Sequence, residues 1–335
     1  MTQGNPTLDY TICLLRVIAC LLIIWNHASC DIFGGWGNGW LWANIGVQIF
    51  FFMSGYLYGG REIEDVKPWF LKQFKKIAKP YYLYLAVFFP IIYFLDPSVL
   101  TFTNILIELV FLEGFAPGYQ IGYIGHHWFI SYILLCYILT PFLLSKIRIS
   151  GGGYWTKIII ATIILQAVTL PLALLIKLKI AYIMTFAVGY FYKVRYLDNN
   201  RLEEKRILHI SIVVIALILI AVRAWLESEN FIGLMDKMKD MSVQYIKLVW
   251  AFAIFIIFEH LIPSDSWKHV NERMKNRLSI LSGMTYEIYI VHQFYVTDTF
   301  TQFFPFPPVI KFVIALIFMF ATGWLLWRVS KMIKI

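Results

Sequence analysis

Arg16 and His27 could carry chemistry, because both lie inside the apolar run from Tyr10 to Ser29. A guanidinium and an imidazole are costly inside hydrocarbon, so each needs a protein partner or a water-filled cavity. They are eleven residues apart, which is about three turns of an α-helix and places them on one face, roughly 16 Å apart along the axis. This spacing predicts one wall of a polar channel through an apolar protein.

Further polar residues lie in or beside other apolar segments, and we expect them on the acceptor side of the channel or in a supporting role. Asn44 and Gln48 are four residues apart, so they share a helix face and also suit hydrogen bonds between helices. Asp31 follows His27 by four residues and could orient its imidazole if the helix extends that far. The remaining candidates are His126, His127, Trp128, Ser131, Glu287 and His292.

Several other kinds of site have little support in the sequence. Only His126 and His127 are close together among the histidines, and there is neither a His-x-x-x-His pair nor a Cys-x-x-Cys motif, so we expect no metal site. The sequence also lacks a Gly-x-Ser-x-Gly elbow, a P-loop and a dinucleotide fingerprint. We therefore expect no bound cofactor.

The composition identifies the elements that must hold these residues. Of 335 residues 60% are hydrophobic and only 15% are charged, whereas soluble domains average about 45–50% and 25%. The chain is therefore predicted to be an all-α integral membrane protein, with one transmembrane domain over residues 1–335 and no appended soluble domain. The net charge of +9 does not indicate nucleic acid, because the basic residues form short clusters between apolar segments.

Apolar windows of suitable length predict about ten transmembrane helices. They cover residues 10–29, 42–60, 79–95, 127–146, 155–176, 180–194, 207–226, 244–262, 279–299 and 309–330. Most of the 29 lysines and arginines fall on the side of the N-terminus, which predicts that both ends are cytoplasmic. The hairpin at 177–194 can be drawn in more than one way, because its second helix is short.

Two connections are longer than a helical bundle needs. Residues 61–79 are predicted to form a basic amphipathic helix on the cytoplasmic surface, with Trp69 and Phe70 facing lipid. Residues 96–126 contain no lysine or arginine, and the periodicity from Thr103 to Glu113 predicts a helix at the outer interface. The glycine-rich end of this second segment leads to the two adjacent histidines.

Four motifs resemble the acyltransferase-3 family of membrane O-acyltransferases. They are Arg16 and His27 with ten residues between them, FFMSG at 51–55, HWFIS at 127–131 and YEIYIVH at 286–292. The resemblance covers nearly the whole chain. It implies a multi-pass protein of a bacterial-type cell membrane that transfers an acyl group, usually acetyl from cytoplasmic acetyl-CoA, to a hydroxyl of a surface glycan or its lipid-linked precursor. It also implies that His27 is catalytic and that Arg16 is its partner.

The sequence departs from the family pattern in places. Many relatives have Trp-x-x-Ser-x-Glu where this chain has Trp128, Ser131 and Ile133, so a mechanism that needs that carboxylate cannot be transferred. Glu287 stands where a small residue is common and could place a carboxylate near His292. The secreted esterase-like domain of many relatives is missing, so we expect this chain to complete the transfer alone or to pass its product to another chain.

These features lead to a hypothesis for the reaction. Four lysines would gather the nucleotide end of the acyl-CoA donor, namely Lys72, Lys75, Lys76 and Lys79. Arg16 would contact a phosphate or the pantetheine arm, and His27 would act as the base for the acceptor hydroxyl. The same lysines also suit anionic membrane lipid. A flippase of a lipid-linked sugar, a different acyl group, transfer through an acyl-histidine, and any oligomeric state all remain open.

Overall fold

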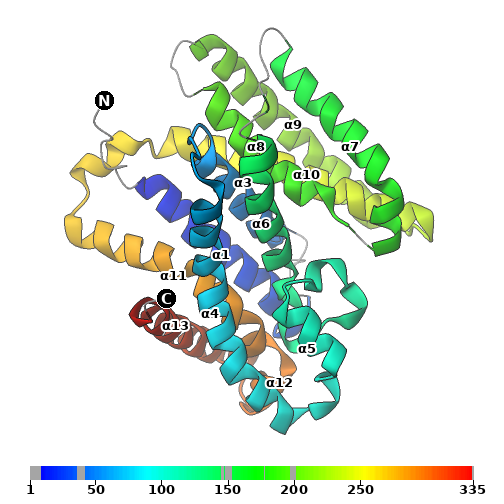
Figure 1. Cartoon of the computed structure of the whole chain (residues 1–335), viewed down its shortest axis with the longest axis vertical. Coiled ribbons are helices and arrows are strands. Elements are labelled where there is room, and N and C mark those ends of the chain that lie inside the picture. Colours follow the sequence, from blue (N-terminus) through cyan, green and yellow to red (C-terminus); the bar gives the residue numbers. More distant parts are fainter. Residues whose placement is uncertain are drawn as a thin grey trace.

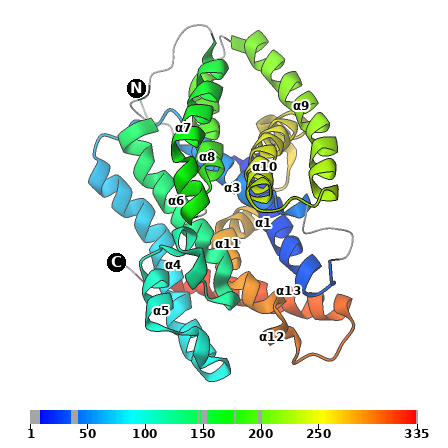
Figure 2. The same ribbon diagram turned by 90° about the vertical axis from the view of Figure 1, so that its right-hand side faces the viewer.

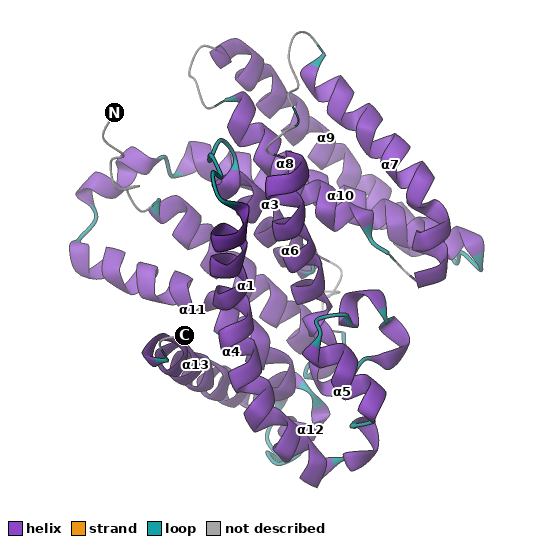
Figure 3. Ribbon diagram, viewed as in Figure 1, coloured by secondary structure: helices purple, strands orange, loops and turns teal. Residues whose placement is uncertain are grey.

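The computed structural model describes residues 9–35, 42–144, 147, 153–176, 178–196 and 201–333. In these residues all regular secondary structure is helical, as predicted (Figure 3). The helices are α1 (Tyr10–Asp31), α3 (Gly46–Tyr58), α4 (Val66–Leu95), α5 (Phe102–Leu109), α6 (Trp128–Leu139), α7 (Tyr154–Ile176), α8 (Ile180–Arg195), α9 (Leu202–Ser228), α10 (Leu234–Leu261), α11 (Glu272–Val296), α12 (Asp298–Thr301) and α13 (Pro308–Met332). Short 3₁₀ helices include η3 (Glu113–Phe115) and η5 (Gly122–His127).

In the part of the chain that the structure describes, seven helical segments are long and apolar enough to cross a membrane, so the chain is a polytopic membrane protein. They comprise α1, α4, the segment Gly122–Phe142 that contains α6, the first part of α7, α9, α10 and α13. The other three predicted windows fall on α3, α8 and α11. The first two have only 13 and 16 residues, and polar side chains lower the hydropathy of α11. The count of ten and the side of each terminus stay predictions, and residue 177 lies outside the described residues.

The helices form two groups with α1 and α3 between them. In Figures 1 and 2, helices α7 to α10 lie at one end of the molecule and α5, α12 and α13 at the other, whereas the long helix α4 runs from the middle of the molecule to the second end. Helix α1 packs against α3 and α11, and α11 packs against α13. Helix α1 therefore contacts the helix that carries the FFMSG motif, α3, and the helix that carries the YEIYIVH motif, α11.

Helix α1 begins and ends close to the predicted bounds. Asp9 caps its N-terminus, because the carboxylate accepts hydrogen bonds from the backbone N–H groups of Thr11 and Ile12 at 3.0 and 3.2 Å. The helix continues to Asp31 and is followed by two glycines with positive φ, Gly34 and Gly35. Asp31 therefore lies one helical turn beyond His27, as its proposed orienting role requires.

Helix α4 corrects two predictions. Residues 66–95 form one continuous helix, not a surface helix followed by a separate span. Trp69 does not face lipid, because its ring packs edge-on against Tyr58 and Tyr137 with centroids 5.4 and 6.4 Å apart. Gln73 and Ile77 follow it at four-residue intervals and are buried, so Trp69 belongs to the inner face of the helix. Because the segment contains many lysines, its sequence pattern did not indicate this buried face.

Helices α3 and α8 approach until their backbones touch. A Cβ atom added to Gly55 on α3 would overlap the backbone of Phe186 on α8, and one added to Gly189 would overlap Phe52. Gly55 is therefore a close-packing position between the two helices. This contact fixes the position of α3, which carries Ser54 toward the site described below.

We predict that Gly55→Ala destabilises the protein, because the added methyl group must separate α3 from α8. Overpacking of this kind costs about 1–3 kcal/mol. Gly283→Ala is a matched control on α11, where a Cβ would meet the Trp327 side chain at an ordinary 3.5 Å. Thermal unfolding in detergent, followed by tryptophan fluorescence, should show a lower midpoint for Gly55→Ala only. Equal midpoints for the two variants would contradict the contact.

Candidate active site

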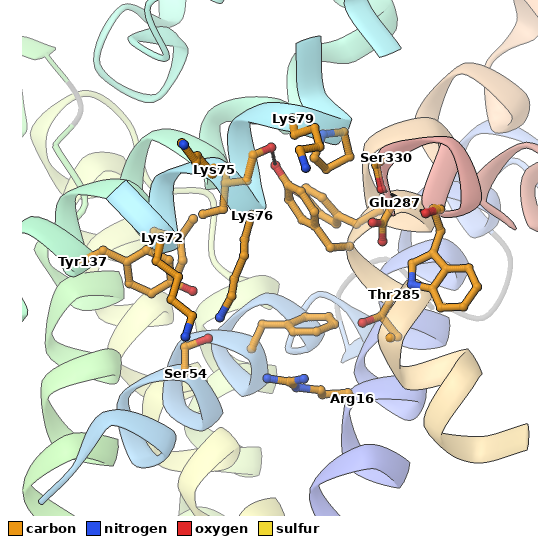
Figure 4. A pocket seen from close by; sticks show the side chains of 18 of the residues that line it. Arg16, Ser54, Lys72, Lys75, Lys76, Lys79, Tyr137, Thr285, Glu287 and Ser330 are labelled. Atoms are coloured by element: carbon orange, nitrogen blue, oxygen red, sulfur yellow. Dashed lines mark hydrogen bonds between the residues drawn. The ribbon is translucent and has the colours of Figure 1, made fainter. Parts of the chain in front are cut away.

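A cavity of about 790 Å³ opens between α1, α3, α4, α6, α11 and α13 (Figure 4). Its lining includes Arg16 from α1 and Ser54 from α3, opposite the basic stretch of α4. The side chains of Lys72 and Lys76 extend from α4 toward Arg16, as Figure 4 shows. Lys72, Lys75 and Lys76 are exposed, so the cavity reaches the protein surface beside them.

The lining of this cavity is strongly basic. It contains six cationic side chains, namely Arg16, Lys72, Lys75, Lys76, Lys79 and Lys331, and one carboxylate, Glu287. Two of the lysines form hydrogen bonds with uncharged groups. Lys76 donates to the Gln73 side chain at 3.2 Å, and Lys79 donates to the carbonyl of Ile333 at 2.7 Å. Such a surplus of positive charge is suited to phosphate groups, which lysine and arginine bind through charge-assisted hydrogen bonds.

Glu287 lies in the basic cavity and His292 does not, contrary to the expectation of a carboxylate near His292. Glu287 lines the basic cavity, where its Oε2 atom is buried and none of the described residues offers it a hydrogen bond. Five residues along a helix turn the chain through about 140°. His292 therefore points to another face of α11, toward His27.

Four of the seven histidines lie in a row, with neighbouring rings tilted or edge-on to one another. The ring centroids of His27 and His292 are 5.0 Å apart, those of His292 and His126 4.5 Å, and those of His126 and His127 4.4 Å. The row joins α1, α11 and the end of η5, which are distant in sequence. His126, His127 and His292 are buried, whereas His27 is partly buried at one end. We call these four residues the histidine row.

Hydrogen bonds fix the orientation of the two central rings. His126 has its Nδ1 atom 2.7 Å from Oε1 of Gln293 and its Nε2 atom 3.0 Å from the carbonyl of Ile290. His292 has its Nδ1 atom 2.6 Å from the carbonyl of Tyr289. Because a carbonyl only accepts, Nδ1 of His292 must carry the proton. In neutral His292 the Nε2 atom is then an acceptor, and it is buried without a partner in the described part of the chain.

Tyr289 links the basic cavity to the histidine row. It lines the cavity, and its ring centroid is 5.1 Å from His126 and 5.4 Å from His292. Its hydroxyl donates to the carbonyl of His126. The residues that line the cavity include Arg16 but not His27. Among the described residues, the polar route predicted along α1 is therefore not one open channel but a basic cavity and a packed histidine row that meet at Tyr289.

The sequence model of the acyltransferase domain matches residues 9–328, which is nearly the whole chain. The chain belongs to the acyltransferase 3 family. It is thus a membrane acyltransferase, as the four motifs suggested. No curated protein and no solved structure matched it.

The remaining candidate residues of this acyltransferase have mainly structural contacts. Gln48 donates from α3 to the Gln244 side chain of α10 at 2.8 Å, which suits the helix-packing interpretation. Trp128 stacks on Tyr182 with centroids 4.7 Å apart. Ser131 accepts a hydrogen bond from the backbone N–H of Gly114 at 2.9 Å. Asn44 lies in the turn before α3, and Asp31 is exposed at the end of α1.

Sequence reasoning missed several residues of the acyltransferase that adjoin the histidine row. Gln293 and Tyr289 position His126, and both belong to the same helix as His292. Glu108 and Glu113 also adjoin the histidine row, and their presence in a segment without lysine or arginine was a signal. Burial raises the pKa of the Glu113 carboxyl well above its usual range, and the nearby Glu108 raises it further.

We predict that Ser54→Cys, prepared with Cys30→Ser because Cys30 is exposed, reacts with a membrane-impermeant maleimide. Ser54 lines the basic cavity, so the reagent can reach it from the open side. Ser131→Cys is the matched control, because Ser131 is only 2% exposed. Mass spectrometry of vesicles of each orientation would measure the labelling. Labelling of the first variant from the cytoplasmic side alone is expected, whereas labelling of Ser54→Cys no stronger than the background of the control would show that the cavity is closed.

Proposed function

We propose that this acyltransferase moves an acetyl group from cytoplasmic acetyl-CoA to a hydroxyl of an extracytoplasmic surface polysaccharide or its lipid-linked precursor, in a bacterial-type cell membrane. The observation that carries the proposal is the meeting of the basic cavity and the histidine row at Tyr289. The basic cavity is suited to an anionic donor, and the histidine row supplies a base for the acceptor alcohol. The exchange of an acyl group requires both.

The donor would enter the basic cavity. Acyl-CoA carries phosphates at its nucleotide end, and the exposed Lys72, Lys75 and Lys76 stand at the opening where that end would remain. Arg16 lies on the opposite wall and would hold a phosphate or the pantetheine arm. The cavity volume of about 790 Å³ is in the range of pockets that enclose small ligands, about 300–1,000 Å³. The thioester would then approach Tyr289.

The transfer step would use His27 as the general base. His27 removes the proton of the acceptor hydroxyl while its oxygen attacks the thioester carbonyl. The carbon–sulfur bond breaks, an ester forms, and the CoA thiolate takes the proton from the histidine. His292 lies against His27 with its Nδ1 proton held by the carbonyl of Tyr289, so it would keep the neighbouring ring in place. The acceptor would approach along residues 96–126.

We predict that His27→Ala abolishes acetylation of the surface glycan while the glycan is still exported. Loss of a general base lowers the rate about 10²–10⁴-fold. His269→Ala, at an exposed site in a 3₁₀ helix, is the control and should retain activity. Mass spectrometry of the surface glycan measures both quantities. Loss of the glycan itself would support a flippase instead, and an unchanged acetyl content would exclude His27 as the base.

We also predict that Arg16→Ala weakens use of the donor more than it alters the chemical step. Hydrogen bonds to charged groups contribute about 1.5–3 kcal/mol, so the apparent KM for acetyl-CoA should rise about 10- to 100-fold. Arg206→Ala is the control, because Arg206 is 73% exposed on α9. The readout is release of the CoA thiol in membrane vesicles at varied acetyl-CoA concentrations. An unchanged KM with a much lower kcat would contradict a donor-binding role.

A further inference from the structure

Three buried side chains with metal-binding atoms converge at the end of the histidine row farthest from His27. Glu108 comes from α5, Glu113 from η3 and His127 from the end of η5. Their potential ligand atoms all lie within 4.8 Å of one another, and each residue is only 1% exposed. None of the three lines the basic cavity, so this Glu–Glu–His cluster is separate from the proposed donor site.

The hydrogen bonds of the cluster leave one carboxylate unsatisfied. Oε1 of Glu108 lies 2.6 Å from Nδ1 of His127 and accepts a hydrogen bond from the Tyr81 hydroxyl at 2.8 Å. By contrast, both carboxylate oxygens of Glu113 are buried and have no hydrogen-bond partner among the described residues. Burying a charged carboxylate without a partner is strongly unfavourable, so the cluster must bind either a proton or a cation.

A single shared proton would satisfy only part of this requirement. A proton between the two carboxyl groups would engage one oxygen of Glu113 and leave the other without a partner. A cation can contact both carboxylates and the imidazole at once. We infer that Glu108, Glu113 and His127 bind a divalent transition-metal ion. One imidazole nitrogen with carboxylate oxygens is a donor set that suits zinc or manganese.

The surrounding groups are arranged as outer partners of such a site. Metal-binding histidines usually donate their other ring N–H to a carbonyl or carboxylate, and ligating carboxylates are themselves hydrogen-bonded. Nε2 of His127 lies 3.3 Å from the carbonyl of Ile290, so it can donate there when Nδ1 faces the ion. The Tyr81 hydroxyl donates to Glu108. The ion would tie α5 and η3 to the start of α6.

Metal content of the purified protein tests this inference. The full chain, purified with a tag that contains no histidines, is stripped with a chelator, incubated with Zn²⁺ or Mn²⁺, desalted and measured by inductively coupled plasma mass spectrometry. We expect one ion per chain in the wild type and its loss in Glu113→Gln. The matched control is Glu203→Gln, because Glu203 is 81% exposed on α9, and it should bind as the wild type does.

Thermal unfolding of the wild type provides a second measurement that does not depend on a variant's folding. A ligand that binds only the native state raises the midpoint, so Zn²⁺ or Mn²⁺ should raise it and a chelator should reverse the change. The inference would be overturned if neither ion bound to or stabilised the stripped wild type. It would also be overturned if folded Glu113→Gln retained the same metal content.

Discussion

A charged or polar side chain removed from water must find a partner or a cavity, and α1 uses both solutions on one helix face. Arg16 opens into a cavity with five lysines and Glu287, whereas His27 packs against His292. These requirements explain which polar residues the helices packed against α1 must supply. Helix α11 supplies Glu287 and Tyr289 to the cavity and His292 to the histidine row, because these residues lie on different faces of it.

Much of this arrangement could be predicted from the sequence where a strong local signal existed. Apolar windows located the helices. The intramembrane Arg16 and His27 identified the helix that borders both the basic cavity and the histidine row. The sequence pattern was less informative where tertiary packing decides the outcome. The inner face of α4, which begins at Trp69, was assigned to lipid because its basic neighbours dominate the pattern.

The Glu–Glu–His cluster illustrates a second limit. Glu108 and His127 are nineteen residues apart, and Glu113 lies between them, so no metal-binding spacing joins the three. They meet because α5 ends near Phe111, which has a positive φ of 60°, and because Ser131 holds the backbone of Gly114 against α6. Chain reversal, and not helical periodicity, creates the cluster. The contacts of Tyr289 with the cavity and the histidine row could not be predicted either, because the sequence of an apolar helix does not show what one of its aromatic residues contacts.

The central claim is that an acyl group passes from a donor in the basic cavity to an acceptor at the histidine row, and that these two parts of the site meet at Tyr289. Inside-out membrane vesicles that contain the acceptor glycan test this most directly, because radiolabelled acetyl-CoA can be added at the cytoplasmic face alone. The account predicts that label appears in ester linkage on glycan inside the vesicles, and only when the protein is present. Label found only on acceptors at the cytoplasmic face, or retained entirely on CoA, would contradict it.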